Sequence, residues 1–387
     1  MAKVIVGMSG GLDSSVTAYI LKKQGYEVEG VSFIMWDPGK ETAPAACCSL
    51  RAIEEGARAA RHLGIKHSGI DVREEFIGKV IEPFVNSYVT GSTPNPCVLC
   101  NRFIKFPSLM NEAVKRGAEY ISTGHYARVE PAKSKEHGAK SEERRAKSKN
   151  NSEHLHDYFF LKKGIDPKKD QSYFLYILRQ EELKRLILPL GYYKKNEIRK
   201  LAKELNLSAA ERAESQEICF IEDRKYIAFI ERLSPVAGNP GPILALNGKV
   251  IGTHKGIYGY TIGQRKGLGI SSPEPLYVVK IDVTKNTIYA GPRDAARKKE
   301  FFVRDINWIN TSIFMAPKGD EERPTQFKGA VKVRSTMREE TATVYIAESK
   351  EQRAVRVVFD EPQWAPAPGQ AAVFYHTDTV IGGGIII

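Results

Sequence analysis

The chain is poor in cysteine, tryptophan and long apolar runs, and each shortage excludes a class of protein. Its 387 residues include five cysteines and three tryptophans. So few cysteines cannot form the disulfide framework of a small secreted protein, and the adjacent pair Cys47 and Cys48 indicates a reducing compartment. We interpret that pair as small buried hydrophobic residues rather than reactive groups. No stretch reaches the roughly 18 apolar residues of a membrane span, and residues 1–11 hold no signal-peptide core. We therefore expect a cytoplasmic protein with no membrane partner.

Acidic residues are also in short supply. The chain has 46 Asp and Glu against 58 Lys and Arg, which gives a net charge of +12. A basic excess of this size favours a polyanionic partner such as nucleic acid. With 42% hydrophobic and 27% charged residues the composition is that of a globular protein, and the length calls for two or three domains.

The first half of the chain alternates short apolar runs with helical periodicity. The pattern predicts strands at residues 4–6, 28–35 and 120–123, and helices at 14–23, 51–63, 76–88, 106–116, 170–178 and 196–205. Such alternation is typical of an α/β domain with a doubly wound parallel sheet covered on both faces, here residues 1–212. Short strands separated by turn residues follow. They predict a central β domain over residues 213–283 and a C-terminal β-barrel over residues 284–387.

A charged segment interrupts the first domain. Residues 132–151 almost lack large apolar side chains and contain seven basic and three acidic residues. Such a composition cannot bury enough apolar surface to fold, so we expect a solvated, disordered insertion. The basic excess of the chain persists without it.

The strongest local motif follows the first predicted strand and opens the first helix. It reads GMSGGLDS and comprises Gly7, Met8, Ser9, Gly10, Gly11, Leu12, Asp13 and Ser14. Glycines let backbone N–H groups surround a phosphate, and the start of the helix adds positive potential. The serines supply hydroxyl groups, while Asp13 could orient the site or help to hold Mg²⁺. No Lys-Ser/Thr pair follows the glycines, so the motif is not a Walker A loop.

Three cysteines form a second constellation. Cys97 and Cys100 make a CxxC after two prolines, which stiffen a loop, and Cys219 lies far along the chain. Two cysteines on separate loops can exchange a sulfur atom through persulfide and disulfide steps when one of them is a thiolate.

These motifs together resemble the bacterial tRNA-specific 2-thiouridylases, a family within the PP-loop ATP pyrophosphatase superfamily. The similar segments are GMSGGLDSSV, CCSLRAIEEGARAARHLGI, TGSTPNPCVLCNRFIKF, KDQSYFL and YTIGQRKGLGI. The resemblance spans the chain except the charged insertion. It implies a PP-loop domain, a central β domain and a C-terminal β-barrel. It also implies that ATP is used to place sulfur on C2 of the wobble uridine of tRNA, with a cysteine desulfurase or sulfur-relay protein as donor.

The resemblance also implies roles for individual residues. Cys100 would be the nucleophile and Cys219 the carrier of the persulfide. ATP would contact the loop from Gly7 to Ser14 and two further residues, Met35 and Gly124. The target base would meet Asn95, Pro96 and Cys97, and tRNA would contact His125, Lys169, Asp170, Gln171, Arg334 and Gln370.

Cys97 departs from a branch of the family in which this position is Asp. The three thiolates of Cys97, Cys100 and Cys219 could then hold a [4Fe-4S] cluster with one open iron. Persulfide chemistry without a cluster is the alternative. Two other functions remain open: a different PP-loop enzyme, acting on another nucleotide or a small molecule, and a non-catalytic RNA-binding protein whose cysteines hold a structural metal.

Overall fold

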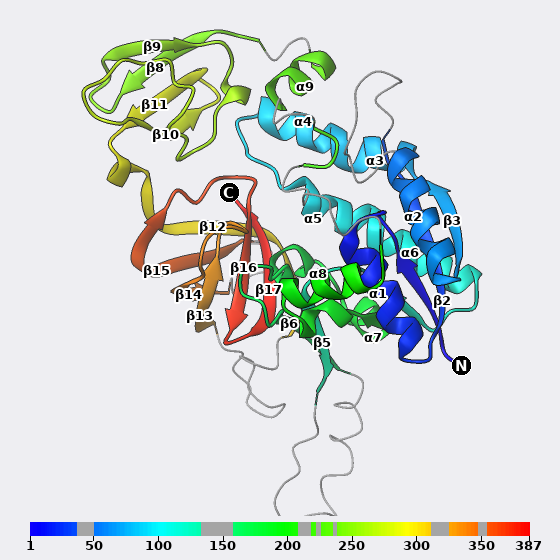
Figure 1. Ribbon diagram of the computed structural model, residues 1–387. Coiled ribbons are helices and arrows are strands. Elements are labelled where there is room, and N and C mark those ends of the chain that lie inside the picture. Colours follow the sequence, from blue (N-terminus) through cyan, green and yellow to red (C-terminus); the bar gives the residue numbers. More distant parts are fainter. Residues whose placement is uncertain are drawn as a thin grey trace, which may run out of the picture.

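Three β-sheets organise the chain in its computed structural model. The structure describes residues 1–36, 50–132, 158–207, 218–221, 226–234, 238–310, 325–346 and 354–387. The interpretations of Cys47, Cys48 and residues 133–151 therefore lie outside the described residues. Figure 1 shows the first sheet with its helices, the central β domain and the barrel as three separate bodies, with the helix that carries the CxxC among them.

The first sheet is parallel and has the strand order β3-β2-β1-β4-β7. Its strands are β1 (Lys3–Gly7), β2 (Glu27–Ile34), β3 (Lys66–Asp71), β4 (Tyr120–Ser122) and β7 (Leu186–Ile187). Helices α1 (Leu12–Lys23) and α2 (Leu50–Leu63) pack with Val4 and Val6 on one side. Ile5 points to the other side, where it shares a core with α4 (Glu82–Val89) and α6 (Phe106–Lys115). The predicted doubly wound sheet is confirmed.

Two helical predictions differ from the structure. The helix at 76–88 belongs to a longer run: α3 (Arg73–Phe76), a π segment (Ile77–Ile81) and α4. The helix at 170–178 is wrong, since only a 3₁₀ turn (Ser172–Leu175) forms there. Asp170 Oδ1 accepts hydrogen bonds from the backbone N–H groups of Gly164 and Ser172, at 3.1 Å each. Such local bonds compete with a helix and favour a turn. Farther along are α7 (Gln180–Arg185) and α8 (Lys195–Glu204).

The central domain is a four-stranded sheet in the order β10-β11-β8-β9. Its strands are β8 (Gly241–Ala245), β9 (Val250–His254), β10 (Tyr277–Asp282) and β11 (Thr287–Gly291). Ile243, Val278 and Ile288 are buried in its core. Before it, α9 (Tyr226–Leu233) packs against α4 of the first domain.

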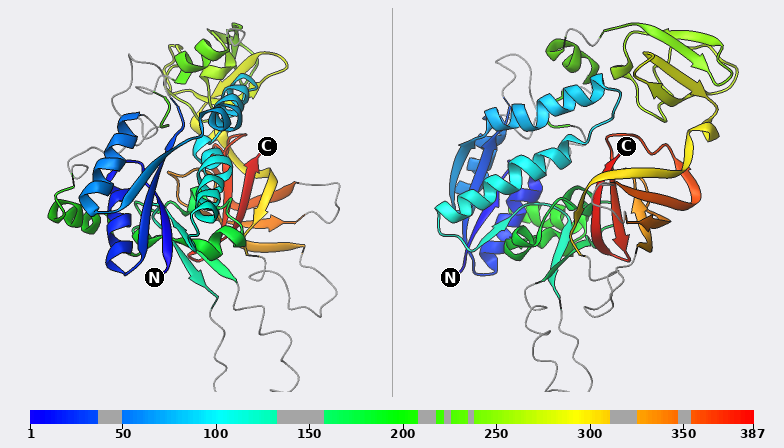
Figure 2. Two further views of the ribbon diagram at one scale, coloured as in Figure 1. Left: turned by 90° about the vertical axis from the view of Figure 1, so that its right-hand side faces the viewer. Right: turned by 180° about the vertical axis from the view of Figure 1, so that it is seen from behind.

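The predicted C-terminal barrel is confirmed, and six strands close it. They are β12 (Arg297–Trp308), β13 (Gln326–Lys332), β14 (Glu340–Tyr345), β15 (Val355–Trp364), β16 (Ala371–His376) and β17 (Thr379–Ile386), and β12 pairs with both β15 and β17. A hairpin that the sequence did not reveal, β5 (Ala127–Pro131) and β6 (Phe159–Lys163), extends this sheet beside β17. Both views of Figure 2 show it next to the barrel. Within the described residues, no helix is long and apolar enough to cross a membrane.

Candidate active site

The glycine-rich motif forms the turn between β1 and α1. Ser14 is buried and its hydroxyl donates to the carbonyl of Gly11 at 3.1 Å, while the backbone N–H of Ser9 donates to that hydroxyl at 3.2 Å. Among the described residues, no side chain caps α1 at Gly11. The first N–H groups of α1 therefore remain available to an anion, as a phosphate-binding loop requires.

Asp13 is held by a lysine that the sequence did not single out. Lys195 Nζ, at the start of α8, donates to both carboxylate oxygens of Asp13 at 2.7 Å, and the Tyr126 hydroxyl donates to Oδ1 at 2.8 Å. The Lys195 side chain is only 8% exposed, against 33% for Asp13. A nearly buried cation therefore lies directly beside the predicted phosphate loop.

The turn after β4 lies against the same loop. A Cβ atom on Gly124 would lie 2.9 Å from the backbone N of Ser14 and 3.1 Å from Cβ of Asp13, so only glycine fits this approach. Next to it, Nδ1 of His125 lies 2.7 Å from the Thr123 hydroxyl, and its ring stacks on Phe106. Burial, with the nearby charge of Lys105, lowers the pKa of His125 to about 3, so its imidazole is neutral at pH 7.

Strand β2 holds the loop by a hydrogen bond, and the residue after its end contacts Cys100. The Ser32 hydroxyl donates to the carbonyl of Met8 at 2.5 Å and lies 2.8 Å from Nε2 of His67. Met35, just after β2, is buried, and its sulfur lies 3.9 Å from Sγ of Cys100. The predicted ATP contact Met35 thus touches the predicted nucleophile.

The CxxC lies on a helix, and the prediction that it lies on a loop is wrong. Helix α5 spans Pro96–Cys100, with Asn95 as its N-cap: Oδ1 of Asn95 accepts from the backbone N–H of Val98 at 3.3 Å. Proline fits the first helical position because its missing N–H has no partner to lose there. Cys97 is exposed at the start of the helix, and Cys100 is buried at its end.

Cys219 lies in the short described segment 218–221. It packs at the margin of the apolar core that contains Cys100. The neighbouring ring of Phe220 is inserted among Phe76, Phe84 and Phe229, with centroid distances of 5.6, 5.3 and 5.4 Å. These aromatic contacts anchor a segment whose sequence alone showed only a distant cysteine.

The described residues do not support a metal cluster. Within the ranges that the structure describes, no group of three His, Cys, Asp or Glu side chains is placed to hold a metal ion. One member of the expected trio, Cys97, is exposed, whereas Cys100 is buried. The structure therefore lends no support to the [4Fe-4S] cluster that the three cysteines suggested.

The residues expected at tRNA fall into two groups. His125, on the turn after β4, and Lys169 are each mostly but not fully buried. Gln171 instead brackets Tyr126: its N–H donates to the Tyr126 carbonyl at 2.9 Å, and its Oε1 accepts from the Tyr126 N–H at 3.0 Å. Asp170 accepts the backbone hydrogen bonds of Gly164 and Ser172 beside the turn at Ser172–Leu175.

The two tRNA contacts expected in the barrel use their side chains inside the protein. Arg334 donates to the carbonyls of Ile262 and Ala365, and Gln370 donates to that of Thr93, all at 2.9 Å.

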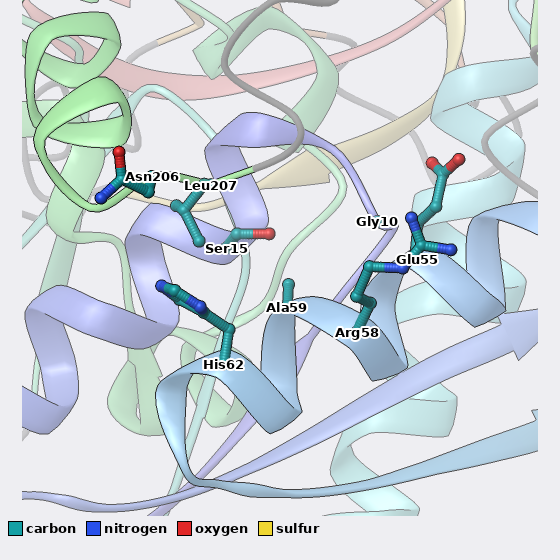
Figure 3. Close-up of a pocket in the computed structure, with 8 residues that line it drawn as sticks. All are labelled: Gly10, Ser15, Glu55, Arg58, Ala59, His62, Asn206 and Leu207. Atoms are coloured by element: carbon teal, nitrogen blue, oxygen red, sulfur yellow. The ribbon is translucent and has the colours of Figure 1, made fainter.

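A pocket lies beside the loop, between α1, α2 and the residues after α8 (Figure 3). Of its lining, only Gly10 was expected at a site from the sequence. The other lining residues are Ser15, Glu55, Arg58, Ala59, His62, Asn206 and Leu207. His62 lies 2.8 Å from the carbonyl of Leu205, which ties α2 to the end of α8.

A doubly wound sheet with a glycine-rich loop after its first strand is typical of nucleotide-binding α/β proteins, and the loop sequence SGGLDS resembles that of the PP-loop class. Family models match the chain at residues 2–223 ("tRNA methyl transferase HUP domain"), 227–292 ("tRNA methyl transferase PRC-barrel domain") and 298–386 ("Aminomethyltransferase beta-barrel domain"). The chain belongs to this family, and its curated relatives at 39–45% identity include tRNA-specific 2-thiouridylases.

Two relatives illustrate the similarity. The tRNA-specific 2-thiouridylase MnmA 2 of Thermoanaerobacter sp. strain X514 is 44% identical, over 99% of this chain and 97% of its own. The tRNA-specific 2-thiouridylase MnmA of Halothermothrix orenii is 42% identical, over 100% and 99%. Among solved structures, a 4-thiouridine synthetase–RNA complex with bound ATP is 17% identical over 60% of this chain and 50% of that chain, with a TM-score of 0.35. That likeness is too low to carry an argument.

Proposed function

We propose that the protein is a sulfurtransferase that uses ATP to thiolate C2 of the wobble uridine in tRNA. One observation carries the proposal: Sγ of Cys100 on α5 lies 3.9 Å from the sulfur of Met35, which directly follows β2, and β2 also bonds the phosphate loop through Ser32. Cys219 packs on the same core. Adenylation and sulfur transfer can therefore take place side by side on one substrate.

The first step converts a poor leaving group into a good one. O2 of the uridine attacks the α-phosphate of ATP, the bond to the β-phosphate breaks, and pyrophosphate leaves. The uncapped N–H groups of α1 suit the phosphates, and the ammonium of Lys195 lies close to them through Asp13. Mg²⁺ would neutralise the triphosphate, with Asp13 as the carboxylate that the loop itself supplies.

The second step transfers sulfur. A persulfide on Cys219, loaded by a persulfide-bearing donor protein, attacks C2 through its outer sulfur, and AMP leaves. The Cys100 thiolate then attacks the inner sulfur of Cys219, which breaks the S–S bond and leaves sulfur on the base. A Cys100–Cys219 disulfide results, and an external dithiol reduces it.

The remaining roles follow from where the side chains lie. Exposed Cys97 and the cap residue Asn95 begin α5, and they are placed to meet the base together with Pro96. His125 is neutral, so it would stack on RNA or hydrogen-bond to it rather than pair with a phosphate, whereas Lys169 would contribute charge. We propose the cytoplasm as the place of action. Of the three expected domains, 1–212, 213–283 and 284–387, we propose the second with its end moved to Gly291, because β11 pairs with β10 and β8 of the central sheet.

Nucleoside mass spectrometry tests the function. Unmodified tRNA is incubated with the protein, ATP, Mg²⁺ and a sulfide source, and a tRNA with cytidine at the wobble position is the control. We expect 2-thiouridine at the wobble position only, with AMP and pyrophosphate as products. ADP and phosphate would contradict the PP-loop chemistry. Sulfur on a different nucleotide would identify another PP-loop thiolase.

A further inference from the structure

A turn of the C-terminal barrel lies directly on the segment that enters α5. The backbone N–H of Thr93 donates to the carbonyl of Pro368 at 2.7 Å. Nε2 of Gln370 donates to the carbonyl of Thr93 at 2.9 Å and lies 3.4 Å from that of Pro94. The two segments are 277 residues apart in sequence, so these bonds are purely tertiary.

Beside the Gln370 amide, the backbone of the turn lies against the backbone of Thr93, and this approach depends on one glycine. Gly369 has φ +90°, and a Cβ atom there would lie 2.8 Å from the Thr93 carbonyl oxygen and 2.9 Å from its N and C atoms. Any other residue would be strained in this conformation and would also push Thr93 away. The turn can therefore lie this close only because position 369 has no side chain.

The same segment is held from two further directions. The Thr93 hydroxyl donates to the hydroxyl of Thr261 in the central domain at 3.1 Å. Asn95, the cap of α5, is a hydrogen-bond partner of buried Tyr173, whose hydroxyl donates to the Ala371 carbonyl of the barrel at 2.9 Å. Residues 93–95 thus touch all three bodies of Figure 1.

We propose that Gln370 and Gly369 are positioning residues for sulfur transfer. They hold residues 93–95 and so set where α5 begins, which in turn sets the positions of Cys97 and Cys100. This inference rests on the proposed function, and it replaces the tRNA contact that the sequence suggested for Gln370. Because its amide is used on Thr93, its loss should slow the reaction of bound tRNA rather than weaken tRNA binding.

The first test compares Gln370→Ala with Gln363→Ala. Gln363 lies in the same barrel and is also partly exposed, but its amide bonds locally, to the carbonyl of Glu361 at 3.0 Å. We expect Gln370→Ala to lower kcat for thiolation by about tenfold to a hundredfold, the effect of a misplaced reacting group, with the Kd for tRNA changed less than about twofold. Gln363→Ala should match the wild type in both.

A second readout reports on α5 without tRNA. Cys100 is buried in the structure. The rate at which iodoacetamide alkylates it, followed by peptide mass spectrometry, should rise in Gln370→Ala, because a displaced α5 would expose the thiol. Gly369→Ala should behave alike. Its control is Gly25→Ala, where φ is +89° but a Cβ atom would meet nothing within 4 Å, so that variant carries the backbone strain alone.

The outcomes separate the inference from the function beneath it. A wild-type protein that makes no 2-thiouridine refutes the proposed function. An active wild type with a raised tRNA Kd, normal kcat and normal Cys100 alkylation in Gln370→Ala would show a tRNA contact and overturn the positioning role. Equal behaviour of Gly369→Ala and Gly25→Ala would overturn it as well.

Discussion

The ion pair of Asp13 and Lys195 should stabilise the first domain, and its distances and exposure give the size of the effect. Lys195→Met keeps the length of the side chain but removes the ammonium that bonds both carboxylate oxygens at 2.7 Å. Removing one partner of a fully buried pair costs about 3–5 kcal/mol. Because Asp13 is 33% exposed, water can replace part of the lost interaction, and we expect a loss of about 2 kcal/mol.

Differential scanning calorimetry without ATP measures the effect. At about 2–4 °C per kcal/mol for a domain of this size, the first transition should fall by about 4–8 °C. Lys200→Met is the matched control on the same helix, because Lys200 is 81% exposed and lies 3.9 Å from Glu204. A surface pair contributes about 0–1 kcal/mol, so this control should move Tm by less than about 4 °C.

A double variant tests the cause. In Asp13→Asn/Lys195→Met the amide carries no charge that needs a counterion, so the double variant should be more stable than the sum of the single losses implies, by about 1 kcal/mol. If Lys195→Met shifts Tm no more than Lys200→Met, the two charges do not stabilise each other and the reasoning fails.

Four further predictions concern chemistry and pH. Cys100→Ser and Cys219→Ser should each abolish thiolation, because sulfur transfer and release need both thiols; residual 2-thiouridine by mass spectrometry would contradict this. Cys97→Ser should keep most activity, and elemental analysis of the anaerobically reconstituted wild type should find no iron; loss of both iron and activity would restore the cluster. The pKa of His125 is about 3 in the folded protein and 6.5 in the unfolded chain, so below pH 6.5 the unfolded chain binds a proton that the folded protein does not. Acidification below pH 6.5 should therefore destabilise the fold by up to about 1.4 kcal/mol per pH unit. His125→Asn should flatten the dependence of Tm on pH. Replacing residues 133–157 by a short turn should leave kcat nearly unchanged, since Ala132 N–H already bonds the Tyr158 carbonyl at 2.8 Å and closes the hairpin; a large loss would assign a role to the insertion.

Patterns in the sequence predicted those secondary-structure elements that depend only on neighbouring residues. The order of β1, glycine-rich loop and α1 follows from apolar periodicity and from the glycines between them, which need no distant partner. The same holds for the turn-punctuated strands of the barrel. Periodicity failed at residues 170–178, because the carboxylate of Asp170 bonds two backbone N–H groups and a turn replaces the helix. It also missed the strands β5 and β6, because residues 132–158 separate them in the sequence.

The arrangement of the site was decided by tertiary contacts. The residue types that carry the chemistry, two thiols and a phosphate loop, can be read from the chain. Lys195 reaches Asp13 across 182 residues and Gln370 reaches Thr93 across 277, and no pattern within either segment encodes the other. Hydrogen bonds and ion pairs act only over a few ångströms, so a partner distant in sequence exists only after the sheet and the barrel have brought the backbones together. The sequence thus predicts which groups react, and the packing of three bodies around α5 decides where they lie.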